Sequence, residues 1–233
     1  MTLAEIAADV VACARCPRLV AHRSAVAQKK KRAHRDEIYW GRAVPGFGDP
    51  AARLLIVGLA PAAHGANRTG RMFTGDRSGD WLYRALYRAG FALQPTATHA
   101  GDGLELVDAY LTASARCAPP DNRPTRDELN ACFSFLEREW RALERVNTVV
   151  ALGQVAFETC LKLAKTVGGD IRTAGGGRKP RFAHGARYRV PGFGLLIASY
   201  HPSQQNTQTG RLTEAMLDAV FAAARANVDN PAA

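Results

Sequence analysis

The sequence has no apolar run long enough to span a bilayer, and no basic segment precedes an apolar core near its first residues. These absences exclude a membrane span and a signal peptide, so we expect a cytoplasmic, nucleoid-associated protein that contacts no membrane. Acids are also scarce: 31 lysines and arginines face 21 acids, a formal net charge of +10. Such a balance favours a polyanionic partner such as nucleic acid.

No internal repeat and no low-complexity linker divides the 233 residues. This length suffices for one substantial core, so we expect one domain over residues 1–233. Within it we expect a distinct N-terminal segment, residues 1–50, and a frayed tail from about residue 226 to 233. Two basic runs, residues 29–32 and 178–181, are each expected to be solvated loops.

Short apolar segments alternate with amphipathic ones along the chain. Capping residues at Thr2 and at Thr125, which forms a capping box with Glu128, predict two helix starts. This alternation is typical of a mostly parallel α/β sheet with helices on both faces, here with four central strands. Residues 12–50 and 168–184 are predicted to be irregular. The predicted strands are residues 53–57, 106–112, 147–152 and 195–199, and the predicted helices are residues 3–11, 78–89, 126–143, 154–165 and a segment after residue 210.

Three polar loops follow predicted strands, at residues 58–76, 114–122 and 200–211. Ligands of open α/β sheets bind at the carboxyl ends of the strands, so we expect these loops to form one site. The first loop has neither of the glycine fingerprints GxGxxG and GxxxxGK[ST], which counts against a dinucleotide or phosphate loop. Its first eight residues also contain no acid.

The chain has five cysteines, and we expect none to form a disulfide in a reducing compartment. Cys13 and Cys16 form a CxxC, Cys117 follows the second predicted strand, and Cys132 lies in the next helix. Four converging thiolates suit either a [4Fe–4S] cluster or a zinc ion. Cys160, midway along an apolar helix, is predicted to be a core residue.

Three motifs and the cysteine spacing together match a known pattern. The motifs are GLAPAAHG at residues 58–65, NRTGRMFTGD at residues 67–76, and a segment beginning His-Pro-Ser at residues 201–213. In this order the chain resembles the iron–sulfur uracil-DNA glycosylases of the fifth family, the UdgB type, over about residues 13–213. The resemblance implies an α/β/α sandwich of three layers, a [4Fe–4S] cluster that tethers the N-terminal helix, and removal of uracil, and often of other deaminated bases, from DNA.

The resemblance assigns base-binding roles to the first two motifs. A glycosylase must extrude the base and grip it, which requires a π-face and hydrogen bonds. Phe73 matches the stacking aromatic of the family. Backbone amides are expected to bond the base carbonyls, which favours small residues at Gly58, Ala60, Ala62 and Ala63.

The catalytic roles follow from the charges that bond cleavage creates. His201 is predicted to donate a hydrogen bond, as a neutral imidazole, to the anionic leaving base. Asp76, the first carboxylate after the loop, is predicted to position the water or stabilise the sugar cation, with Asp80 as an alternative or as a helix N-terminal charge. Asn122 is predicted either to bond the base or the water, or to form an Asx turn. His64 is predicted to be either a site residue or a surface loop residue.

Related families place an acid close behind the first strand, and the absence of one here belongs to the fifth family itself. Some families also keep an asparagine near the end of the second strand, where this chain has Ala113-Ser114-Ala115, which is compatible with a broader pocket. Residues 204–208 are predicted to enter the minor groove and fill the space that the extruded base leaves. The predicted DNA contacts are Arg68, Arg71, Gln205, Asn206 and Arg211, with Lys179 as a further phosphate contact.

The sequence thus predicts a monomeric, monofunctional DNA glycosylase that acts on uracil and other deaminated bases. Two alternatives stay open. One is an Fe–S or zinc module that binds nucleic acid without catalysis, and the other is a small-molecule α/β enzyme that binds a nucleotide at the first loop.

Overall fold

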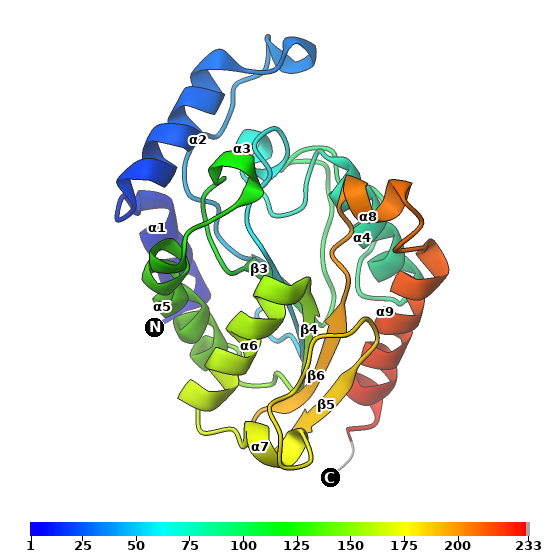
Figure 1. The fold of residues 1–233 in the computed structure, drawn as a ribbon. Coiled ribbons are helices and arrows are strands. Elements are labelled where there is room, and N and C mark those ends of the chain that lie inside the picture. The colour runs from blue at the N-terminus through cyan, green and yellow to red at the C-terminus, as the bar shows by residue number, and fades with distance from the viewer. Residues whose placement is uncertain (232–233) are drawn as a thin grey trace.

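A computed structural model describes residues 1–231 of the chain. Its centre is a six-stranded sheet in the order β1-β3-β2-β4-β6-β5 (Figure 1). The four inner strands are parallel and consist of apolar runs that are almost wholly buried, as is typical when both faces of a sheet are covered. They confirm the predicted α/β class and its four-stranded parallel centre. These strands are β3 (Ala109–Ala113), β2 (Leu54–Gly58), β4 (Thr148–Leu152) and β6 (Gly194–Ser199).

Two antiparallel edge strands, which the sequence did not predict, complete the sheet. β1 (Phe47–Gly48) pairs with β3, and β5 (Arg187–Val190) pairs with β6. β1 is too short to carry a periodic signal. In β5 the alternation of arginine with Tyr188 and Val190 keeps charges on an edge strand, which discourages pairing with other chains.

Helices cover both faces of the sheet and give the three layers that the resemblance implies (Figure 1). Successive strand residues point to opposite faces, so Leu54 and Ile56 pack into one core and Leu55 and Val57 into the other. The helices α4 (Arg77–Arg88) and α9 (Glu214–Asp229) cover the first face, and α5 (Arg126–Ala142) and α6 (Gln154–Thr166) the second. Cys160 of α6 is fully buried, which confirms its predicted place in the core.

The predicted caps are present at both helix starts. Thr2 and Glu5 form a capping box at α1 (Leu3–Ala12), and Thr125 and Glu128 form one at α5. The predicted fraying from about residue 226 is wrong, because α9 continues to Asp229 and Asn227 donates a 2.8 Å hydrogen bond to Thr148 Oγ1. The last two residues of that predicted tail lie outside the described part of the chain.

The N-terminal region contains a helix that the sequence analysis treated as irregular. α2 (Pro17–Lys29) starts directly after the CxxC, with Pro17 at its first position, where the missing N–H costs nothing. Single turns occupy other predicted loops: α3 (Ala66–Thr69), α7 (Ile171–Ala174), α8 (Gln204–Gln208) and the 3-10 turns η1 (Arg32–His34) and η2 (Pro120–Asn122). Within residues 1–231 no helix combines the length and apolarity needed to cross a membrane.

Candidate active site

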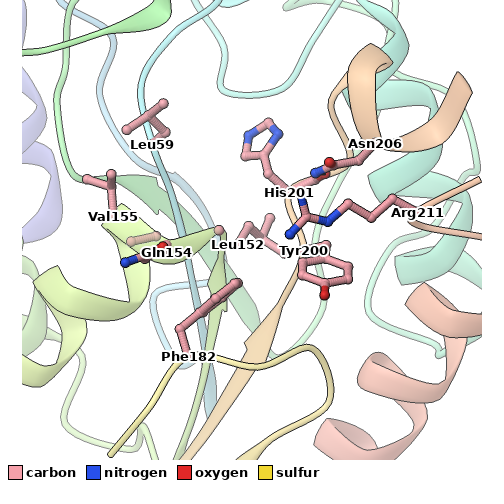
Figure 2. Close-up of a pocket in the computed structure, with 11 residues that line it drawn as sticks. Leu59, Leu152, Gln154, Val155, Phe182, Tyr200, His201, Asn206 and Arg211 are labelled. Carbon is pink, nitrogen blue, oxygen red and sulfur yellow. The ribbon is translucent and has the colours of Figure 1, made fainter. Parts of the chain in front are cut away.

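The loops after β2 and β6 meet at the carboxyl edge of the sheet, as predicted, and the start of α6 after β4 joins them. A cavity of about 300 Å³ opens there. The predicted loop at residues 114–122 contributes no lining residue to this cavity. Figure 2 shows Leu59 and Val155 on one side of it, and His201, Asn206 and Arg211 on the other. The remaining lining residues are Leu152, Gly153, Gln154, Ala156, Phe182 and Tyr200.

The predicted stacking aromatic and the predicted proton donor lie against each other. The rings of Phe73 and His201 are stacked, with centroids 5.5 Å apart and planes inclined by 29°. Gly58 makes room for this arrangement, since a Cβ there would lie 2.7 Å from Phe73 Cε2. The role of Gly58 is therefore to let the phenyl ring rest on the end of β2.

His201 is half-buried at the end of β6. Burial lowers the pKa of its imidazole to about 4, so the ring is neutral at physiological pH. Asn206 Nδ2 fixes the residue by donating a 2.8 Å hydrogen bond to its carbonyl oxygen. Neither ring nitrogen has a hydrogen-bond partner among the described residues, so an N–H remains available to a ligand.

The first loop offers unused backbone donors. The N–H groups of Ala60, Ala62 and Ala63 donate to no acceptor within residues 1–231. The turn is held from its other side, because Ala62 O accepts from the amides of Gly65 and Asn67 at 3.2 and 3.1 Å. Backbone N–H groups need partners, so these three are candidates for binding the carbonyls of a ligand.

Asp76 lies half-buried at the far end of the same loop and caps α4, where its Oδ1 accepts from Gly79 N at 3.0 Å. Burial raises the pKa of this carboxyl, while the amides of Gly79 and Ser78 oppose the rise. Its second oxygen, Oδ2, faces Gly65. Asp80 is exposed in the first turn of α4, where it suits a helix N-terminal charge.

Asn122 stands apart from these groups. It is exposed in η2 with a φ of 55°, and its side chain has no hydrogen-bond partner among the described residues. The Asx-turn interpretation is wrong, because the residue two positions on is Pro124, which has no N–H to donate. No hydrogen bond joins Asn122 to Asp76 or His201.

The structure corrects the assignment of Arg68 and Arg71 as phosphate contacts. Both side chains are at least nine-tenths buried. Arg68 pairs with Glu37 and donates to the carbonyl oxygens of His64 and Gly75, each at 2.8 Å. Arg71 donates to both carboxylate oxygens of Asp102 at 2.8 Å. These guanidinium groups shape the loop from inside and cannot reach a phosphate.

Gln205, Asn206 and Arg211, which were also predicted to contact DNA, lie in or next to α8 at the cavity, whereas Lys179 lines a separate cavity. Gln205 is exposed in α8, which is a short helix where a flexible segment was predicted. The side chain of Asn206 donates its hydrogen bond to the carbonyl oxygen of His201. Arg211 is exposed, with Cζ 4.6 Å from the centre of the Tyr200 ring.

His64 forms a contact that the sequence did not foreshadow. Its Nδ1 lies 3.0 Å from the hydroxyl oxygen of Tyr39, a residue of the supposedly irregular N-terminal region. Desolvation lowers the pKa of His64, and the charge of nearby Lys31 adds to this effect.

A further unpredicted feature is the start of α6 at the cavity. Its N-cap residue is Gly153, which has no side chain to cap the helix, so the first amides of α6 are unpaired.

The four predicted metal-ligating cysteines come together beside α2. Cys13 and Cys16 lie between α1 and α2 and pack against the apolar cluster that contains buried Cys117. Burial raises the pKa of the Cys16 thiol, and the proximity of Cys132 of α5 further raises the pKa of both Cys16 and Cys117. Burial raises the pKa of Cys117 to about 11. Within the described chain no three His, Cys, Asp or Glu side chains already stand at metal-ligand geometry.

Arg23 places a buried positive charge beside these cysteines. Its side chain is only 7% exposed, and it donates from Nη1 to Cys117 Sγ at 2.9 Å and from Nη2 to Cys13 O at 3.1 Å. Within residues 1–231 it has no carboxylate partner, whereas the other buried arginines do, and its Nε has no hydrogen-bond partner. An unpaired buried cation is costly, so thiolates bound to a metal centre fit the charge that Arg23 requires.

Comparisons with known proteins agree with this geometry. Residues 45–225 match the model of the uracil DNA glycosylase superfamily. A type-5 uracil-DNA glycosylase of Mycobacterium leprae is 52% identical over 94% of this chain and 93% of its own. One from Thermus thermophilus is 52% identical over 89% and 90%. A type-4 uracil-DNA glycosylase of Archaeoglobus fulgidus is 31% identical over 69% and 70%.

Proposed function

The chain belongs to the uracil DNA glycosylase superfamily and, within it, to the type-5 enzymes, and we propose that it is a monomeric, monofunctional glycosylase that hydrolyses uracil from nucleoid DNA in base excision repair. One observation carries the proposal. Phe73 and His201 stack on each other at the carboxyl edge of the sheet, next to the first loop, in which the amides of Ala60, Ala62 and Ala63 donate no hydrogen bond within residues 1–231. An aromatic face, a neutral donor and unused N–H groups are the groups that an extruded base requires.

The reaction breaks the bond between the sugar C1′ and the base nitrogen, and the electron pair leaves with the base. We propose that Phe73 stacks on the base and that the amides of Ala60, Ala62 and Ala63 bond its carbonyl oxygens. As negative charge develops on the base, the neutral His201 donates a hydrogen bond to it. A donor placed where charge develops lowers the barrier most, because it is already oriented when the charge appears.

Water completes the hydrolysis by adding its oxygen to C1′ and releasing a proton that the departing base anion takes up. We assign Asp76 to orient this water or to stabilise the sugar cation. Its cap bond with Gly79 holds one carboxylate oxygen, and Gly65, which has no side chain, leaves space in front of the other. Asn122 is a weaker candidate for the same task, since nothing fixes its side chain.

The end of β3 supports a wider substrate range that includes hypoxanthine and xanthine. Ser114 Oγ donates to Gly58 O at 3.1 Å, so its hydroxyl hydrogen is not available to a bound base. Its neighbours Ala113 and Ala115 carry no polar side-chain atom. A base edge at this position therefore meets no side-chain amide that would select pyrimidines, and backbone groups tolerate more than one ring system.

We further propose that the four cysteines hold a [4Fe–4S] cluster, with zinc as the alternative. Thiolates suit both metal centres. When bound, the cluster supplies a rigid, negatively charged junction and no electron, since hydrolysis transfers none. Cys13, Cys16, Cys117 and Cys132 would then tie α1 and α2 to the loop after β3 and to α5. Iron and sulfide analysis of purified protein decides between the two centres, because zinc without iron would refute the cluster.

The decisive assay uses a duplex with a single uracil, incubated with metal-replete protein. We expect free uracil and an abasic site that breaks only on alkali treatment. Parallel duplexes with hypoxanthine and xanthine test the wider range. Binding to all three duplexes without release of any base would instead identify a non-catalytic nucleic-acid-binding module.

A further inference from the structure

Residues 29–42, which we call the basic arm, connect α2 to the segment before β1. Ile38 is 94% exposed, the highest value among the large apolar side chains described. The arm has only two acids, Asp36 and Glu37, and Glu37 is paired with Arg68 and with His34. Its exposed cations are Lys29, Lys31, Arg32, Arg35 and Arg42.

The arm is fixed to the first loop of the active site. The amides of Trp40 and Gly41 donate to the carbonyl oxygens of Arg68 and Asn67, at 2.9 and 3.0 Å. The Trp40 ring rests on Gly70, where a Cβ would lie 2.9 Å from Cδ2. Ile38 is thus held on an anchored backbone, with its side chain in solvent.

Its position relative to the catalytic groups is also set. Arg68 binds Glu37, which precedes Ile38, and also binds the carbonyl of Gly75, which precedes Asp76. Figure 1 shows the arm, after α2, on the same edge of the molecule as α3, with α8 across the edge from it. The arm therefore forms one flank of the active-site edge, and the polar helix α8 forms the other.

We propose that the basic arm binds duplex DNA beside the extruded base, with its cations on the phosphates and Ile38 against the base pairs. This inference rests on the proposed function, because it takes the extruded base as its reference point. The positive charge of the arm favours binding to a polyanion such as the DNA backbone. An apolar side chain inserted between base pairs partly unstacks them, as in other proteins that distort a duplex. A protein partner would need to match five exposed cations around one isoleucine.

The charge component is tested by replacing Lys31, Arg32 and Arg35 with glutamine. These side chains are exposed and form no ion pair within the described chain, so the fold should be retained. Binding to a duplex with a stable abasic analogue should weaken, and the slope of log affinity against log salt should become shallower by about two to three. The matched control replaces Arg145, Lys165 and Arg172, which lie near the opposite end of the sheet, and should leave the slope unchanged.

The apolar component is tested by Ile38→Ala, with Val107→Ala as its control. Val107 is 42% exposed and precedes β3, at the edge away from the site. Ile38→Ala should weaken binding to the duplex about tenfold, as expected for loss of one buried aliphatic side chain, and leave single-strand binding unchanged. An environment-sensitive base next to the lesion should show less unstacking.

These readouts separate the arm from the proposed function. Wild-type protein that binds the duplex but releases no base would count against catalysis, and the arm would still be judged by the binding assays. Equal losses on single and double strands would overturn the role of Ile38. An unchanged slope of log affinity against log salt in the variant of Lys31, Arg32 and Arg35 would show that the basic arm does not contact DNA, and would favour a protein partner for it instead.

Discussion

Gly65 and Asp76 face each other across the loop that joins β2 to α4: a Cβ on Gly65 would lie 1.9 Å from Asp76 Oδ2. The two ends of one sequence motif therefore close on each other, and the smallest residue stands where the carboxylate needs room. Asp76 is a helix cap and, in the proposed function, also the catalytic carboxylate, and variants at these two positions can test the two roles separately.

Asp76→Asn should keep the cap, because the amide oxygen can still accept from Gly79 N, while the negative charge is lost. We expect kcat to fall at least about a hundredfold, with DNA affinity and melting temperature nearly unchanged. Because burial raises the pKa of Asp76, the acidic limb of the wild-type rate profile should lie above the ordinary value of 3.8 and vanish in the variant. Equal loss of binding and turnover would remove Asp76 from catalysis.

Gly65→Ala tests the same group from the other side. The added methyl must displace the carboxylate of Asp76, so kcat should fall as in Asp76→Asn, although the proposed catalytic side chains of Asp76 and His201 both remain. Single-turnover kinetics on the uracil duplex measure this effect. Gly210→Ala is a useful control, since a Cβ at Gly210 meets no atom within 4 Å, although its φ of +70° adds local strain. Full activity of Gly65→Ala would show that the close approach has no catalytic meaning.

His201 should make stability depend on pH. The folded protein binds a proton at His201 only near pH 4, whereas the unfolded chain does so near 6.5. The unfolded state therefore gains protons first, and stability should be lost progressively as the pH falls from 6.5 towards 4. Urea unfolding at pH 7 and pH 5 should show a smaller decrease for His201→Gln than for wild type. An equal decrease in both would contradict the lowered pKa.

Arg23→Met should reduce the metal content of the purified protein. Without the guanidinium, the charge of four thiolates and their metal centre would lack its buried counter-charge. We expect less iron and sulfide per chain, a several-fold faster loss of the visible absorption band in air, and partial rescue by Arg23→Lys. Lys29→Met, an exposed position on the same helix, is the control. Unchanged metal retention in Arg23→Met would dissociate this residue from the metal centre.

Arg71→Met distinguishes a structural arginine from a DNA contact. The change leaves the Asp102 carboxylate buried without its partner, which typically costs about 3–5 kcal/mol of stability. The salt dependence of DNA binding by the folded variant should stay as in wild type. A slope shallower by about one would restore Arg71 as a phosphate contact.

The strands and the long helices could be predicted because their signals are local. Buried strands such as β2 are continuous apolar runs, and Thr125 with Glu128 marks a helix start within four residues. The predicted phosphate contacts of Arg68 and Arg71 were wrong because the partners of these side chains are distant in sequence. Arg68 and Arg71 each pair with an acid 31 positions away, in opposite directions along the chain, and no local pattern reveals such a partner.

The N-terminal region shows the same limit. Residues 12–50 were predicted to be irregular, although Pro17 is well suited to the first position of a helix and starts α2 there. The family resemblance assigned separate roles to Phe73 and His201, but their stacking joins residues from different loops and was not predicted. The fold was thus more accessible from sequence than the contacts inside the site.

The unpaired hydrogen-bond donors of the first loop are backbone N–H groups, which most amino-acid substitutions do not remove. A missense change at Ala60, Ala62 or Ala63 alters the side chain and keeps the N–H, unless the new residue is proline. Conventional mutational scanning would therefore report only the effect of side-chain size at these positions and would not test the proposed hydrogen bonds to the base. Replacing individual peptide bonds by esters in semisynthetic protein removes one N–H at a time and would test whether each of them binds the base.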